Sequence, residues 1–166
     1  MEEMTLKKCI EFAVATEENG ARFYKQMAGK FAANREISDL FKSLSKDETV
    51  HRKKFAKLLS KVPQDSGVSN APEQSEYLRA MSISEFFSHR QGPFKDAGKI
   101  KSMDDALEKA FDFEKATLGF YQAVQDVLGK NRTLTSIIKE EKSHITSLMK
   151  ALVTGEKFRS LQDEWA

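Results

Sequence analysis

The feature that most constrains this fold is a Glu-x-x-His motif that occurs twice, each time in a segment with helical periodicity. In "KDETVHRKKF" Glu48 stands three residues before His51, and in "KEEKSHITSL" Glu141 stands three residues before His144. Residues three apart share one face of a helix. Apolar residues continue that face in both segments, so we expect both pairs to point into a hydrophobic core.

Four long helices are predicted from apolar periodicity and from residues that suit helix ends. Their expected ranges are residues 5–30, 34–61, 102–128 and 131–154. Asn34 and Ser102 are suited to begin helices, and Gly129 to end one. All three Pro residues lie between residues 62 and 101, where the periodicity is irregular. We expect this segment to be a long connection that carries a short helix, and the C-terminal segment to add another.

The lengths of the connections predict the topology. Short links join the first helix to the second and the third to the fourth, so each pair should form an antiparallel hairpin. The segment 62–101 is long enough to cross the length of a bundle. We therefore predict an all-α four-helix bundle with one long crossover, in which residues 1–166 form a single domain.

The two hairpins also resemble each other in sequence. Glu17 and Tyr24 in the first helix correspond to Glu114 and Tyr121 in the third, with the same spacing and the same Phe before each Tyr. Each half therefore has a Glu and a Phe-Tyr pair on one helix and Glu-x-x-His on the next. The tyrosines are either core residues or hydrogen-bond donors to the carboxylates.

Four carboxylates that face one apolar core would repel one another and lose their hydration. Two divalent cations would neutralise them, and mixed oxygen and imidazole ligands suit iron or manganese better than calcium or structural zinc. Such ligand sets occur in dimetal carboxylate bundles. We predict a dimetal site with two iron ions, or manganese or a mixed pair, whose ligands are Glu17, Glu48, His51, Glu114, Glu141 and His144.

The alternative is that these acids are solvated, because a single Glu-x-x-His pair is common on exposed helices. The repetition of the motif on apolar stripes favours the metal site. Glu18 and Glu140 compete with their neighbours Glu17 and Glu141, and the spacings to the tyrosines and histidines favour the latter. His89 has no matching acid, and we expect it at the surface.

Composition excludes several other classes of protein. The net charge of +2 gives no reason to expect nucleic acid or a membrane as a partner. Cys9 is the only cysteine, which excludes an internal disulfide and a cysteine-rich metal module, and we expect it to be a packing residue. No apolar run approaches a membrane span and the N-terminus does not resemble a signal peptide, so we expect a cytoplasmic protein. Trp165 would anchor the C-terminal segment.

With these motifs, the chain resembles the rubrerythrin branch of the ferritin-like superfamily over residues 10–152, in a form without the rubredoxin module. The resemblance implies a ferritin-like fold in which Glu48 and Glu141 bridge two irons and His51 and His144 are terminal ligands. Members of this family reduce hydrogen peroxide at a diferrous site, and related proteins act as ferroxidases. By analogy with relatives that exchange the long connection between protomers, we expect a homodimer.

Two departures from the family pattern affect the expected activity. With one cysteine, the chain cannot form the iron–tetracysteine centre of rubrerythrins, so an external electron donor such as a rubredoxin is expected. Typical members also carry a further Glu three residues after the third-helix ligand, where this chain has Thr117, and the corresponding first-helix residue is Gly20. We therefore expect an oxidoreductase that acts on peroxide or dioxygen, with a non-enzymatic iron-handling protein as the alternative. A helical interaction module without metal is the third hypothesis.

Overall fold

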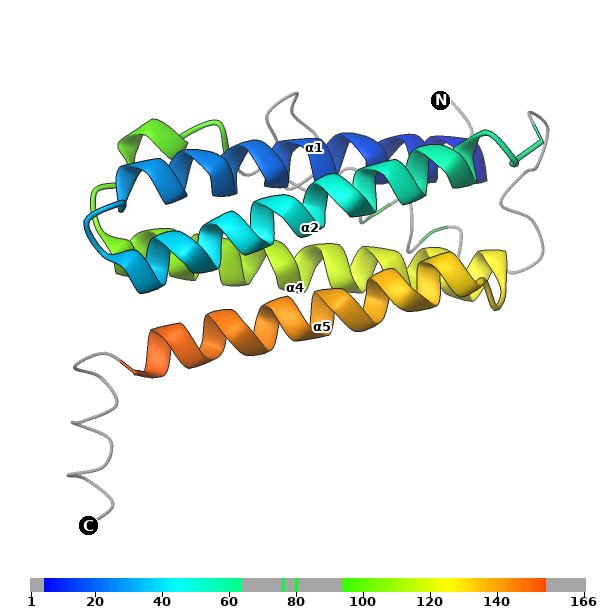
Figure 1. Cartoon of the computed structure of the whole chain (residues 1–166). Coiled ribbons are helices and arrows are strands. Elements are labelled where there is room, and N and C mark those ends of the chain that lie inside the picture. The colour runs from blue at the N-terminus through cyan, green and yellow to red at the C-terminus, as the bar shows by residue number, and fades with distance from the viewer. Residues whose placement is uncertain (1–4, 64–75, 77–79, 81–93, 155–166) are drawn as a thin grey trace, which may run out of the picture.

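The computed structural model describes residues 5–63, 76, 80 and 94–154, and its regular elements there are helices (Figure 1). Four are long: α1 Leu6–Lys30, α2 Arg35–Leu59, α4 Met103–Leu128 and α5 Arg132–Val153. The predicted all-α four-helix bundle is confirmed, and each helix falls inside its expected range. A short 3₁₀ helix, η2 Ala97–Lys99, lies within the expected crossover. His89, Trp165 and the C-terminal segment lie outside the described residues.

The helices form two antiparallel hairpins, α1 with α2 and α4 with α5, which pack together along their lengths (Figure 1). α2 ends at one end of the bundle and α4 begins at the other. The two helices consequently run in the same direction, as one long crossover between the hairpins requires.

Local sequence explains where the long helices begin and where α4 ends. The side-chain oxygens of Thr5, Asn34, Ser102 and Asn131 each accept a hydrogen bond from the backbone N–H three residues later, at 3.1–3.2 Å. Such caps satisfy one of the free N–H groups of a first helical turn. Gly129 follows α4 with a φ of 81°, in the left-handed region that favours glycine.

Two apolar clusters fill the bundle, one on each side of its middle. One includes Cys9, Phe55 and Ile137, and the other includes Phe41 and Phe113. Cys9 is fully buried, as expected of a packing residue, and burial raises the pKa of its thiol to about 11. In the described part of the chain, no helix is long and apolar enough to cross a bilayer. The clusters leave a layer of polar side chains between them at mid-helix.

Candidate metal centre

The polar layer at the middle of the bundle contains all six residues that the sequence predicts as metal ligands. The least exposed have 0% of their surface accessible and the most exposed 5%. They are Glu17 on α1, Glu48 and His51 on α2, Glu114 on α4, and Glu141 and His144 on α5. Helical spacing accounts for the inward direction of each Glu-x-x-His pair. Of the competing acids, Glu18 is exposed and Glu140 lies at the edge of the layer.

The potential ligand atoms form two groups. The first group consists of Glu17, Glu48, His51 and Glu141, and the second of Glu48, Glu114, Glu141 and His144. Within each group, one oxygen or ring nitrogen per residue lies within 4.8 Å of the others. Glu48 and Glu141 belong to both groups, so they lie between two positions at which an ion can be held. Three carboxylates and one imidazole form a donor set that suits iron or manganese.

The charges buried in this layer do not balance by themselves. Four carboxylates face two imidazoles, and no Lys or Arg is among the buried residues that the structure describes. Burial and then the charge of Glu17 raise the pKa of Glu48 well above its usual value, and burial and then Glu114 do the same for Glu141. Divalent cations would remove both the repulsion and the desolvation penalty.

Four buried ligand atoms lack a hydrogen-bond partner in the described structure, and they belong to the four residues of the first group, two of which are shared with the second. They are Glu17 Oε2, Glu48 Oε1, His51 Nδ1 and Glu141 Oε1. His51 Nδ1 lies 2.8 Å from Glu141 Oε1 and 3.4 Å from Glu17 Oε2, but without the angles of hydrogen bonds. Buried polar atoms are nearly always satisfied. Atoms that converge on one another without bonding are what an ion-binding position requires, so these residues fit a bound cation.

Each histidine faces the ligand groups with Nδ1 and the bundle surface with Nε2. His51 Nε2 lies 2.6 Å from Glu140 Oε2, and His144 Nε2 lies 3.3 Å from Asp47 Oδ2. Each acid therefore comes from the helix that carries the other histidine. An acid on the outer nitrogen fixes the tautomer and orientation of a metal-binding imidazole.

The two outer acids differ in their own support. Glu140 also contacts Lys54 Nζ at 3.0 Å and accepts a hydrogen bond from Ser136 Oγ at 3.1 Å. Although burial opposes the shift, His51 and then Lys54 lower the pKa of Glu140 to about 2. Within the described residues, Asp47 has no cationic partner besides the His144 ring. The first group thus has the more firmly held histidine.

Reasoning from sequence did not assign these two acids a role. The spacings in the sequence present Glu140 only as an alternative to Glu141 and give no role to Asp47. A signal was present, because an acid directly precedes the motif Glu in both copies, as "DETVH" and "EEKSH". The complete repeat is therefore acid-Glu-x-x-His.

The two tyrosines join α1 and α4 across the layer. The Tyr24 hydroxyl donates to Glu114 Oε1, and the Tyr121 hydroxyl donates to Glu17 Oε1. Both rings are fully buried, and burial followed by the charge of the bonded Glu raises each tyrosine pKa well above 10. Burial opposes ionisation of Glu114, but hydrogen bonding to His144 lowers its pKa. The tyrosines act both as core residues and as hydrogen-bond donors to the carboxylates.

The two positions three residues after Glu17 and Glu114 supply no further carboxylate. Thr117 Oγ1 lies 3.0 Å from the backbone oxygen of Glu114 and 3.4 Å from Glu141 Oε2. A Cβ atom on Gly20 would lie 2.9 Å from a ring carbon of Phe113, so a side chain at this position would require that ring to shift. The layer therefore offers four carboxylates and two imidazoles.

A family model described as Rubrerythrin matches residues 8–152. Neither the search of curated proteins nor the search of solved structures found a match.

Proposed function

Because the chain belongs to the rubrerythrin family, we propose that it is a nonhaem diiron protein that reduces hydrogen peroxide, or dioxygen, with electrons from a separate donor protein. The observation that carries this proposal is the set of four unsatisfied buried ligand atoms, two of which belong to the carboxylates shared by both groups. Such atoms would be unfavourable in a helical module without a metal.

The proposed ligands are the six residues of the polar layer. Glu48 and Glu141 would be shared between two ions, because each belongs to both groups. His51 and Glu17 would complete the first group, and His144 and Glu114 the second. The same donor set also accepts manganese or a mixed metal pair.

Reduction of hydrogen peroxide consumes two electrons and two protons and yields two water molecules. Two bound ferrous ions would supply the electrons and the Lewis acidity for cleavage of the O–O bond. The contribution of the chain is orientation and exclusion of water. Tyr24 and Tyr121 hold one oxygen of Glu114 and one of Glu17, and their raised pKa values keep the donated protons on the phenol oxygens. The apolar clusters on both sides of the layer would limit the access of water along the bundle.

The proposed activity requires an external reductant. With Cys9 alone, the chain cannot build a four-cysteine iron centre, and Cys9 lies in the apolar core. A small one-electron carrier such as a rubredoxin has the appropriate chemistry.

The test is a peroxide titration of iron-loaded protein that has been reduced without oxygen. We expect rapid peroxide consumption, with the near-ultraviolet absorption of a diferric centre appearing as the peroxide is consumed. The control is the double variant Glu48→Ala/Glu141→Ala, which lacks both shared carboxylates. Consumption no faster than that of the control would refute the proposal.

Thr117 favours a second candidate function, iron binding and oxidation without peroxide turnover. This hydroxyl lies 3.4 Å from Glu141 Oε2, where family members with the full peroxidase pattern supply a carboxylate. An iron-handling protein would consume oxidant once per loaded centre and then stop. An excess of reductant therefore distinguishes the two functions, because only the reductase continues to consume peroxide.

A further inference from the structure

A strongly basic groove lies between the end of α2 and the start of α5. Its volume is about 430 Å³. Among the described residues, the charged side chains that line it are all cationic: Lys54, Lys57 and Lys61 from the α2 side and Arg132 from α5. The other lining residues are uncharged. We call this surface the α2–α5 groove.

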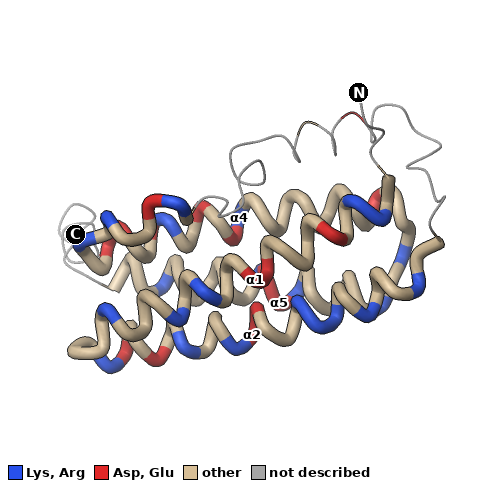
Figure 2. Tube along the Cα trace, turned by 90° about the horizontal axis from the view of Figure 1, so that it is seen from above, with Lys and Arg blue, Asp and Glu red and all other residues tan. Residues whose placement is uncertain are grey.

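The charge of the groove originates in the sequence of α2. Residues 49–61 include no acid and five Lys or Arg residues. Figure 2 shows the resulting run of Lys and Arg positions along the end of α2. Within the described residues, Lys57, Lys61 and Arg132 have no ion-pair partner. The whole chain carries a net charge of only +2, so this positive charge is a local feature.

The α2–α5 groove is connected to the candidate metal centre by a chain of contacts. Lys54 lines the groove, and its Nζ lies 3.0 Å from Glu140 Oε1. The other oxygen of Glu140 lies 2.6 Å from His51 Nε2. Ser136 also lines the groove and donates to Glu140. A molecule seated in the groove would be separated from His51 by two side chains, first Lys54 or Ser136 and then Glu140.

We propose that the α2–α5 groove is the docking surface for an acidic electron-donor protein, and that electrons enter the metal centre on the His51 side. The proposal rests on the proposed function, because it names the partner surface of that centre. Unpaired positive charge steers and orients a negatively charged partner. The contact chain through Glu140 provides a short route from that partner to the centre.

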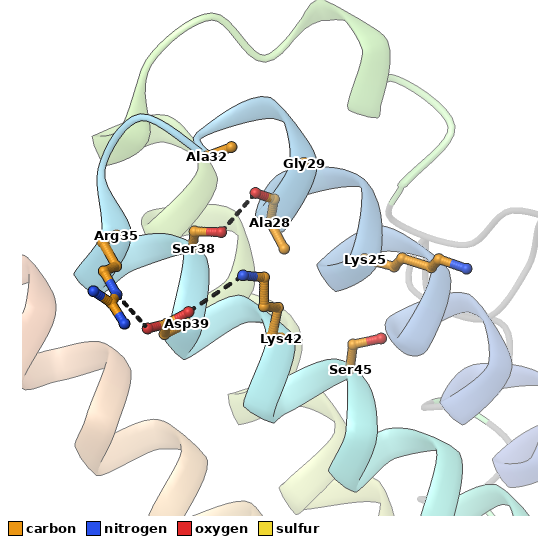
Figure 3. Close-up of a pocket in the computed structure, with 9 residues that line it drawn as sticks. All are labelled: Lys25, Ala28, Gly29, Ala32, Arg35, Ser38, Asp39, Lys42 and Ser45. Carbon is orange, nitrogen blue, oxygen red and sulfur yellow. Dashed lines mark hydrogen bonds and ion pairs between the residues drawn. The ribbon is translucent and has the colours of Figure 1, made fainter.

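A second groove provides an internal comparison. It lies between α1 and the start of α2, has a volume of about 410 Å³, and is lined by Lys25, Arg35 and Lys42 (Figure 3). Asp39 lies between two of these cations, 3.8 Å from Arg35 and 3.3 Å from Lys42. Its positive charge is therefore partly neutralised. None of its lining residues contacts a candidate ligand in an interaction found among the described residues.

The test is binding of a zinc-substituted rubredoxin of net negative charge to the metal-free protein, measured by calorimetry at low ionic strength. The groove variant is Lys57→Glu/Lys61→Glu/Arg132→Glu, and the matched control is Lys25→Glu/Arg35→Glu/Lys42→Glu. We expect the groove variant to weaken binding by about tenfold or more and the control to change it by less than about twofold. Added salt should reduce this difference.

Electron entry is tested with reduced iron rubredoxin and the oxidised, iron-loaded protein. We expect the groove variant to lower the second-order rate constant by about tenfold at low salt, and the control variant to leave it within about twofold. Equal effects of the two variants would overturn the proposal, as would binding of a DNA oligonucleotide without binding of the acidic protein. The calorimetric measurement needs neither iron nor peroxide. Failure of the docking proposal is therefore distinguishable from failure of the proposed function.

Discussion

The two halves of the candidate metal centre have matching ligands and differ in the residues around those ligands. Inside, each half has a shared pair of carboxylates, a histidine and a Glu held by a tyrosine of the opposite hairpin. Outside, His51 meets Glu140 at 2.6 Å, and Glu140 is supported by Lys54, whereas His144 meets Asp47 at 3.3 Å. The internal repeat is therefore strict at the six ligands and the two tyrosines. The residues that support the outer acids differ and give the halves different surroundings.

A similar difference separates the positions that follow Glu17 and Glu114. Gly20 is closed by the ring of Phe113, whereas its counterpart Thr117 carries a side chain whose hydroxyl lies near Glu141. In α1 the residue that corresponds to Phe113 is Thr16, which is much smaller. The large Phe113 and the small Gly20 of one pair therefore correspond to Thr16 and Thr117, two residues of intermediate size. The ligands stay matched while the packing behind them does not.

The largest expected effect would come from breaking the shared carboxylates. Glu48 belongs to both groups and Glu17 to the first alone, so the two residues should differ in how much metal their loss removes. We expect Glu48→Gln to lower the iron content from about two ions per chain to near none, and Glu17→Gln to leave about one. Metal analysis after anaerobic loading measures both. Equal loss in the two variants would mean that Glu48 is not shared between two ions.

Sequence predicts those features of the centre that depend on local helical geometry, and it does not predict those that depend on how separate helices pack. Glu48 and His51 share a face because of local helical geometry, so their direction was predictable from spacing alone. The pairing of Tyr24 with Glu114 depends on how α1 and α4 align lengthwise, which no local pattern encodes. The same holds for Phe113 over Gly20.

The surface of the centre was harder to predict for a related reason. Glu140 and His51 lie far apart in the sequence and meet only because α2 and α5 are adjacent. The acid-Glu-x-x-His repeat identifies the two outer acids, but the histidine that each acid contacts depends on which helices are adjacent. The α2–α5 groove likewise arises from two separate segments, and an overall net charge of +2 conceals it.

The next effect concerns the outer acids. If the support of Glu140 strengthens the first group, Glu140→Gln should weaken iron binding by about 10–100-fold. Asp47→Asn should weaken it by less, because the Asp47 contact with His144 is longer and unsupported. Competition with a chelator gives both affinities. Glu18→Gln, at an exposed acid next to a ligand, is the control and should have no effect. A larger loss for Asp47→Asn would reverse the ranking of the two halves.

The two tyrosine–glutamate hydrogen bonds test whether the matched pairs of the two halves have equal strength. Tyr24→Phe and Tyr121→Phe each remove a buried hydrogen bond to a carboxylate and keep the ring. Each should lower the free energy of unfolding by about 1.5 kcal/mol, the lower range for a bond to a charged group. Chemical denaturation of the metal-free protein measures the change. Because both rings are fully buried and each hydroxyl donates to one buried carboxylate, the two values should agree within about 0.5 kcal/mol. A wider gap would show that the packing difference between Gly20 and Thr117 affects these hydrogen bonds.

The smallest effect distinguishes the packing on the two sides. Gly20→Ala should gain up to about 1 kcal/mol of helix propensity but force a methyl group against Phe113, at a cost of about 1–3 kcal/mol in a packed core. The net expectation is destabilisation by about 1 kcal/mol, because the added Cβ would lie 2.9 Å from a buried ring carbon. Gly29→Ala, in the same helix with open space around it, is the matched control and should be neutral or slightly stabilising. If both substitutions stabilise the protein equally, the Phe113 ring can move away at little cost, and the contact at Gly20 does not restrict the packing.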